Sequence, residues 1–406
     1  MTREAGTRPV DAKQARVVAF YLPQFHTIPE NDEWWGKGFT EWVNVRRAEP
    51  QYAGHDHPRV AADLGEYDLT QDAIKDQQSA LARSAGIDAF CMYFYWFNGQ
   101  RLLEKPLDQW RERPDLLPYC VSWANEAWTR RWDGKEHDVL MPQTYDDGYE
   151  KQFFEDVLPH FEAPHYLRVD DRPILVVHRA DLIPSPRTFA SRMRELAVEA
   201  RIPGLYLVAA ETKPGIDPTT LGFDAVAEFP PVGANTISAA YLRPVKGISP
   251  EFRGRLMSYR RLARRFQRRR PPAFVRHPGI MPGWDNTARR GANATIYAGA
   301  TPQLFGAWAR TAIDRETRAR GSRGLVFINA WNEWAEGAYL EPDQTNGKTF
   351  LESMSGEEST RHAPLHPDHS WWWSLPQLAS IAQSAAGSVL NLARRAKSSL
   401  LRPPGR

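Results

Sequence analysis

The sequence is poor in the features that mark several large classes of protein. It has two cysteines, Cys91 and Cys120, and each lies in an apolar strand-like run, which indicates buried thiols in a reducing compartment. Lys and Arg total 52 against 49 Asp and Glu, and a net charge of +3 is too small for a general nucleic-acid-binding field. No run of about 18 apolar residues occurs, and the first residues lack the apolar core of a signal peptide. We therefore expect a soluble, cytoplasmic protein without a nucleic-acid partner.

Familiar motifs for cofactors and nucleophiles are also missing. No glycine-rich phosphate-binding loop follows the first apolar run, and no Gly-x-Ser-x-Gly elbow occurs. The histidines of the segment His55-Asp56-His57 have no obvious third ligand nearby in the sequence, so the spacing predicts no metal site. We expect the protein to work without a metal or a cofactor.

Aromatic residues, by contrast, are abundant, with 15 Trp, 14 Tyr and 18 Phe, many of them in polar surroundings. The densest cluster follows the apolar run 325–329 and reads Trp331-Asn332-Glu333-Trp334-Ala335-Glu336-Gly337. Glycoside cleavage commonly uses two carboxyl groups that flank one bond, together with flat apolar surfaces for a sugar face. A solvated strand end with an interfacial Trp pair has the same local pattern. The interpretation therefore depends on the rest of the chain.

Eight short apolar runs recur along the chain, and most of them end in polar or aromatic residues. They cover residues 17–22, 89–94, 117–122, 174–177, 205–210, 225–227, 279–281 and 325–329. Amphipathic stretches with helical spacing cover residues 70–85, 149–161, 186–201 and 302–320. Alternating strands and helices predict an α/β protein with a parallel sheet, and eight such units predict a (β/α)8 TIM barrel with its active site at the carboxyl ends of the strands. An open doubly wound sheet is the alternative, which the missing phosphate loop disfavours.

The residues at or just beyond these strand ends form the predicted site. Glu333 and Glu336 are the predicted catalytic pair, because a carboxyl beside a like charge or an apolar wall acquires the raised pKa of a general acid. The predicted sugar contacts are Tyr21, Gln24, His26, Trp35, Glu41, Trp42, Tyr95, Trp96, Trp123, Asn125, Glu126, Trp128, His178, Glu228, Trp284, Asp285, Asn332 and Trp334. Structural roles remain the alternative, for example a loop clamp at Asn125.

Two segments fall outside the barrel pattern, so we expect a barrel over residues 1–345, a basic insertion within 240–275 and an extension over 346–406. Residues 251–270 contain nine arginines and predict a basic helix. Its arginines form either a solvated face or a surface that attracts anionic lipid headgroups or a diphosphate-bearing substrate. The tail predicts an amphipathic helix that ends in Arg394, Arg395 and Lys397, and we expect its apolar face to pack on the barrel or a partner in preference to a membrane.

Five segments, in order along the chain, resemble the WbsX-like proteins of bacterial surface-polysaccharide gene clusters. They are residues 21–26, 31–42, 123–132, 284–286 and 331–337. These proteins are related to glycoside hydrolase family 99, the endo-α-mannosidases and endomannanases. The resemblance implies a (β/α)8 barrel and, for the hydrolase relatives, retaining cleavage of α-mannosidic bonds with participation of the substrate 2-hydroxyl. It implies that Glu333 deprotonates this hydroxyl and that Glu336 is the acid and base at the leaving oxygen. Ala335 departs from the hydrolases, which have His or a similar residue there.

The resemblance leaves three functions open. The first is an enzyme that cleaves an α-linked, mannose-like bond of a surface polysaccharide or of its lipid-linked precursor. The second is a glycosyltransferase of O-antigen or lipopolysaccharide biosynthesis, although no Asp-x-Asp motif for a nucleotide diphosphate stands at a strand end. The third is a non-catalytic glycan-binding protein, which the intact carboxylate pair disfavours. The sequence leaves the sugar, the linkage and the oligomeric state open.

Overall fold

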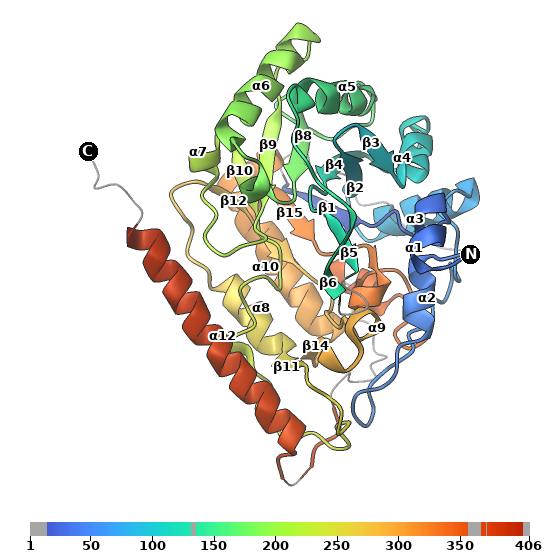
Figure 1. The fold of residues 1–406 in the computed structure, drawn as a ribbon, viewed down its shortest axis with the longest axis vertical. Helices are drawn as coiled ribbons and strands as arrows, with labels where there is room; N and C mark the ends of the chain where they lie inside the picture. Colours follow the sequence, from blue (N-terminus) through green and yellow to red (C-terminus); the bar gives the residue numbers. More distant parts are fainter. Residues whose placement is uncertain (1–13, 131–134, 356–366, 371, 401–406) are drawn as a thin grey trace, which may run out of the picture.

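A computed structural model describes residues 14–130, 135–355, 367–370 and 372–400, and it contains a parallel β-barrel (Figure 1). Neighbouring strands pair in the order β12-β10-β9-β8-β4-β2-β1-β15-β13. These strands are β1 (Arg16–Tyr21), β2 (Ala89–Phe97), β4 (Tyr119–Trp123), β8 (Arg172–Val177), β9 (Tyr206–Ala210), β10 (Ala225–Ala227), β12 (Val275–His277), β13 (Gly279–Ile280) and β15 (Leu325–Ile328). All eight predicted strand runs contribute to it, so the predicted TIM-like fold is confirmed.

The ring closes at the segment formed by β12 and β13, which only Pro278 separates. β12 pairs with β10 on one side, and β13 pairs with β15 on the other. The backbones approach so closely here that a Cβ at Gly279 would lie 2.1 Å from the carbonyl oxygen of Glu228. Glycine at this position therefore permits the closure of the ring.

Helices cover the outside of the barrel, as parallel strands buried on both faces require (Figure 1). They include α3 (Asp72–Ser84), α4 (Glu104–Arg111), α5 (Tyr149–Phe161), α6 (Pro186–Glu199) and α10 (Pro302–Arg320). The start of α10 follows from its sequence, because Pro302 occupies the first turn and the Thr301 side chain accepts a hydrogen bond from the Leu304 amide. The four predicted amphipathic helices are all present.

Short helices, 3-10 turns and short strands lie in the loops at the two ends of the barrel. The helices are α1 (Pro29–Trp35), α2 (Glu41–Arg46), α7 (Pro218–Leu221), α9 (Thr287–Arg290) and α11 (Thr349–Ser355), and the 3-10 turns used below are η3 (Ile237–Ala239) and η6 (Trp334–Glu336). The strands are β3 (Gln100–Leu102), β5 (Trp128–Arg130), β6 (Lys135–Met141), β7 (Arg168–Val169), β16 (Asn332–Glu333) and β17 (Ala338–Tyr339).

The basic segment is only partly helical, which corrects the prediction of one helix over residues 251–270. Its first part is β11 (Arg255–Ser258), which pairs in parallel with β14 (Thr295–Ala298), and the helix α8 covers only Tyr259–Gln267. The Ser258 side chain caps α8 by accepting a hydrogen bond from the Arg261 amide. A small separate apolar core joins this insertion to β14, and it includes Tyr241, Phe252 and Leu256 of the insertion and Ile296 of β14.

The tail forms one long helix, α12 (Leu375–Leu400), which lies along the outside of the insertion beside β11 and η3 (Figure 1). In the described part of the chain, no helix combines the length and the apolar character that crossing a bilayer requires.

Candidate active site

Three carboxylates meet one guanidinium after the carboxyl ends of the barrel strands. Arg289, on α9, donates from Nη2 to Glu333 Oε2 at 3.0 Å and from Nη1 to Glu336 Oε1 at 2.7 Å. Its Nε donates to Glu41 Oε1, also at 2.7 Å. Glu333 ends β16, Glu336 ends η6 and Glu41 begins α2, so four separate elements supply the cluster. The predicted catalytic pair therefore converges, because its two members bind nitrogens of the same guanidinium.

The electrostatics of the pair suit proton transfer near neutral pH. Burial raises the pKa of Glu333 to about 8. The negative charges of Glu336 and Glu41 raise this pKa further, and the positive charge of Arg289 opposes the shift only in part. Burial also raises the pKa of Glu336. One guanidinium cannot neutralise three ionised carboxylates. The cluster therefore favours the uptake of one proton, which Glu333 and Glu336 share. Glu336 is the more open member, with 22% of its side chain exposed.

Aromatic and polar groups surround the carboxylates. Gln24 donates a hydrogen bond of 2.9 Å to the Tyr95 hydroxyl, and burial together with the charge of Glu333 raises the pKa of Tyr95. The ring of Trp128 packs edge-on against Tyr95 and is only partly buried. The predicted residues Gln24, Glu41, Tyr95, Trp128, Glu333 and Glu336 thus belong to one neighbourhood.

A second group of predicted residues lies next to this neighbourhood. Glu126 binds Arg179 and lies 3.8 Å from Nε2 of His178. His178 packs against Tyr93, whose pKa is raised by burial and by the charge of Glu333. Asn125 acts as a loop clamp, because its side chain exchanges hydrogen bonds with the backbone of Arg179.

Several predicted sugar contacts instead belong to the framework. Side chains alternate along a strand, so Phe20 packs on Phe229 while Tyr21 packs on Trp110 of α4 and binds Gln78 of α3. Fully or almost fully buried aromatic rings, none of which is more than 4% exposed, are those of Tyr21, Trp42, Trp96, Trp123 and Trp334. Without a rearrangement, these rings offer no face to a sugar.

Four further predicted residues lie apart from the Arg289 cluster. The side-chain amide of Asn332 accepts a hydrogen bond from the backbone amide of Leu22 and donates one to its carbonyl. Glu228 is buried and forms ion pairs with Arg269 and Arg276. His26 donates a hydrogen bond from Nδ1 to the carbonyl of Pro23, and its buried Nε2 has no hydrogen-bond partner among the residues that the structure describes. Trp35 is half-buried and packs against Phe39.

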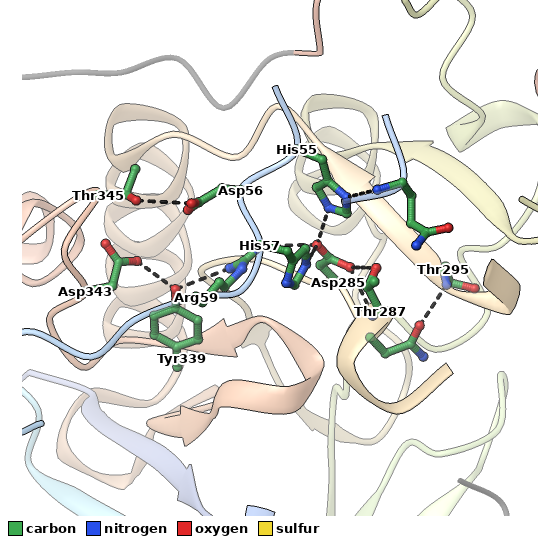
Figure 2. Close-up of polar contacts among 12 residues, drawn as sticks. His55, Asp56, His57, Arg59, Asp285, Thr287, Thr295, Tyr339, Asp343 and Thr345 are labelled. Atoms are coloured by element: carbon green, nitrogen blue, oxygen red, sulfur yellow. Dashed lines mark hydrogen bonds and ion pairs between the residues drawn. The ribbon is translucent and has the colours of Figure 1, made fainter. Parts of the chain in front are cut away.

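The carboxylate of Asp285 points into a cluster of cationic and polar groups (Figure 2). Its Oδ2 is 2.7 Å from Nε2 of both His55 and His57 and 3.3 Å from Arg59, while its Oδ1 accepts from Thr287. These neighbours hold the pKa of Asp285 well below its usual range, although burial opposes them. Asp285 is thus the third partner of the two histidines, which their local sequence did not reveal.

This cluster has the residue types of a metal site, but its protonation indicates a hydrogen-bonded anchor. The backbone amide of Gln51 donates to Nδ1 of His55, so Nδ1 is an acceptor and Nε2 carries the ring proton. A protonated Nε2 donates to Asp285 and is not free to bind a cation. The cluster also anchors the active site, because the Asp285 amide donates to the Glu336 carbonyl at 2.6 Å and α9, with Arg289, begins two residues later.

A small cavity adjoins the anchor, and neither Glu333 nor Glu336 lines it. Its lining includes Tyr52, Trp284, Tyr297, Tyr339 and Asp343. The predicted residue Trp284 therefore borders this cavity, together with Asp285, and not a space lined by the catalytic pair.

Two residues of the site, the partly buried Arg289 and the buried Glu341, were not predicted from the sequence. Arg289 stands beside Arg290 in the sequence, a pattern typical of a solvated surface. Glu341 accepts hydrogen bonds from Trp334, Tyr67 and Gln78 and so fixes the loop that carries the catalytic pair. Its position after Tyr339-Leu340 carries no local signal of this role.

Comparisons with known proteins agree with this architecture. A sequence model described as Glycosyltransferase WbsX matches residues 17–354. WxcX, an uncharacterized protein of Xanthomonas campestris pv. campestris, is 46% identical over 341 residues in strains ATCC 33913 and B100, covering 84% of this chain and 49% of theirs. The chain thus spans about half the length of these relatives.

Solved structures show the same fold at low sequence identity. A glycoside hydrolase-like protein aligns with a TM-score of 0.53 and 16% identity, over 86% of this chain and 95% of its own. The GH99 endo-α-mannosidase from Bacteroides thetaiotaomicron aligns with a TM-score of 0.51 and 12% identity, over 94% and 98% of the two chains. Its complex with Bis-Tris propane gives a TM-score of 0.50 at 12% identity, over 95% and 99%. The chain has a GH99-like fold, and from its sequence match it belongs to the WbsX family.

Proposed function

We propose that the chain is a carbohydrate-active enzyme that cleaves an α-linked, mannose-like glycosidic bond of a bacterial surface polysaccharide or of its lipid-linked precursor. The observation that carries the proposal is the convergence of Glu333 and Glu336 on Arg289. Two carboxyl groups, one buried and one partly exposed, that share a proton at neutral pH supply the acid and the base that glycoside cleavage requires. The GH99-like fold supports a glycan substrate.

In the proposed reaction, Glu333 removes the proton of the 2-hydroxyl and the freed oxygen attacks the anomeric carbon. The bond to the leaving oxygen breaks, and Glu336 gives its proton to that oxygen, which leaves a 1,2-anhydro sugar. Glu336 then deprotonates a water molecule that attacks the anomeric carbon. The epoxide opens as O2 takes back the proton from Glu333. Two displacements at the same carbon retain its configuration.

The substrate itself places the shared proton where this reaction needs it. In the free protein the pKa of Glu333 is raised to about 8, so Glu333 holds the proton at neutral pH. A 2-hydroxyl that donates a hydrogen bond to Glu333 favours its ionised form and lowers its pKa. The proton then moves to Glu336, the general acid of the first step.

Incubation with candidate α-linked glycans, with and without nucleotide sugars, tests the proposal by mass spectrometry of the products. Release of a shorter glycan without a donor, absent in Glu333→Gln, is the expected result. Proton NMR of the first product should show the α-anomer. Strict dependence on a nucleotide sugar or a polyprenyl-phosphate sugar would instead support the second candidate, a glycosyltransferase, which the name of the family, Glycosyltransferase WbsX, favours. Binding without turnover in both assays would support a glycan-binding protein.

A further inference from the structure

The tail helix α12 packs on the insertion through its polar side chains. Gln377, Ser380 and Ser384 are at most 1% exposed. Gln377 accepts from the Val245 amide, and Ser380 Oγ accepts from the Leu256 amide at 2.8 Å. Leu256 belongs to β11, which pairs with β14 on one side and makes an isolated bridge, between Met257 and Ala240, on the other. The polar face of α12 therefore satisfies backbone amides that these strand pairings leave without an acceptor.

Three large apolar side chains of α12, those of Leu375, Leu378 and Val389, consequently face outward, which is the reverse of the predicted packing. Leu375 is 82% exposed and Val389 is 67% exposed. The described part of the chain has eleven exposed large apolar residues, and seven of them belong to this region: Ile237, Leu242, Trp372, Trp373, Leu375, Leu378 and Val389. Single exposed apolar residues are ordinary, but such a concentration indicates an interaction surface.

A row of arginines on α8 and at its C-cap, Arg268, flanks the same surface. Both helices contact the segment 236–239, because Arg265 donates to Thr236 Oγ1 and Ser388 Oγ accepts from the Ile237 amide. Arg261 and Arg268, one turn to either side of Arg265, are exposed, and so is Arg264. Neither α8 nor α12 contains an Asp or a Glu. We call the exposed apolar residues of 372–389 and the arginines 261, 264 and 268 the apolar–basic face.

We propose that the apolar–basic face docks on a bilayer that contains anionic lipids, with α12 lying in the plane of the headgroups. An apolar helix face inserts into the boundary of headgroups and acyl chains, and Trp suits the same boundary. The arginines without acidic neighbours on their own helices complement the negative surface potential of such a bilayer. A protein partner would need an unusual acidic rim beside an apolar groove to match both parts. This inference is independent of the catalytic proposal.

Vesicle co-sedimentation of the full chain tests the proposal, with phosphatidylcholine vesicles that contain or lack phosphatidylglycerol. The expected result is binding that requires phosphatidylglycerol and weakens as the salt concentration rises. The triple variant R261Q/R264Q/R268Q should bind about a hundredfold more weakly, since each arginine near the surface contributes about a factor of five. The variant L375Q/L378Q/V389Q should also lose binding, without any change of charge.

Two matched controls keep the test specific. R318Q removes an exposed arginine from α10, and V198Q changes a valine of α6 that is 65% exposed, so both should bind as the unchanged protein does. Circular dichroism confirms that each variant is folded. Equal binding by all variants, or equal losses in the controls, would overturn the proposal. A concentration-dependent dimer that L375Q/L378Q/V389Q dissociates would also overturn it, because the face would then be covered by a second copy.

Discussion

Replacing Glu333 by glutamine should stabilise the folded protein at neutral and alkaline pH. The pKa of Glu333 is raised from 4.5 to about 8 on folding, so the folded state holds a proton that the unfolded state releases between these values. Stability is therefore lost as the pH rises from about 4.5 to 8. At pH 7 the loss is about 3 kcal/mol for a shift of this size. Glutamine is neutral at every pH, and its amide oxygen can still accept from Arg289, so E333Q avoids this loss.

The assay is thermal unfolding of E333Q and of the unchanged protein over a series of pH values. At pH 7 the variant should unfold about 4 °C higher, given the entropy of unfolding expected for a chain of this size. The difference should vanish as the pH falls to about 4. Glu162→Gln, at an exposed position after α5, is the control and should show neither effect. If E333Q is less stable at pH 8, or if its advantage does not shrink on acidification, the buried-carboxyl argument is wrong.

Three further variants test the site. E336Q should be rescued by substrates with an acidic leaving group and E333Q should not, because only Glu336 protonates the leaving oxygen; equal responses in kcat/KM would contradict these roles. D285N should lower the free energy of unfolding by about 3 kcal/mol or more, since two histidines and Arg59 would lose a buried anion, and denaturant unfolding at the same stability as the unchanged protein would contradict this. R289K keeps one positive charge but not a guanidinium that reaches three carboxylates, so the pH profile of kcat should shift to higher pH; an unmoved profile would exclude Arg289 from control of the pair.

The barrel could be predicted because each strand carries its own signal. Short buried runs such as 325–328 are apolar on both faces, and the polar residues that follow them mark the carboxyl ends. The convergence of Glu333 and Glu336 follows from their place in one such loop. Arg289 could not be predicted, because its three partners lie as far as 248 residues away in the sequence.

The inverted packing of α12 shows a different limit of sequence reasoning. Hydrophobic periodicity predicts which side chains share a face, and the usual assumption turns the apolar face inward. Here the helix packs on an edge of β11 where the Leu256 amide needs an acceptor, and the Ser380 side chain of α12 supplies one. Which side of α12 faces the protein thus depends on the backbone of β11, over a hundred residues earlier in the chain.

The segment where the barrel closes, formed by β12 and β13 and called the seam below, should affect how readily the site opens. β12 and β13 are only three and two residues long, so the strand that completes the ring has few ladder hydrogen bonds on either side. Asp285 and Arg289 follow the seam within ten residues of its end at Ile280. Local opening there would release the guanidinium from its carboxylates while the remaining strands stay paired. We therefore expect hydrogen exchange to be faster at the seam than in β2 or β4, and catalytic competence to decay on warming before the barrel as a whole unfolds.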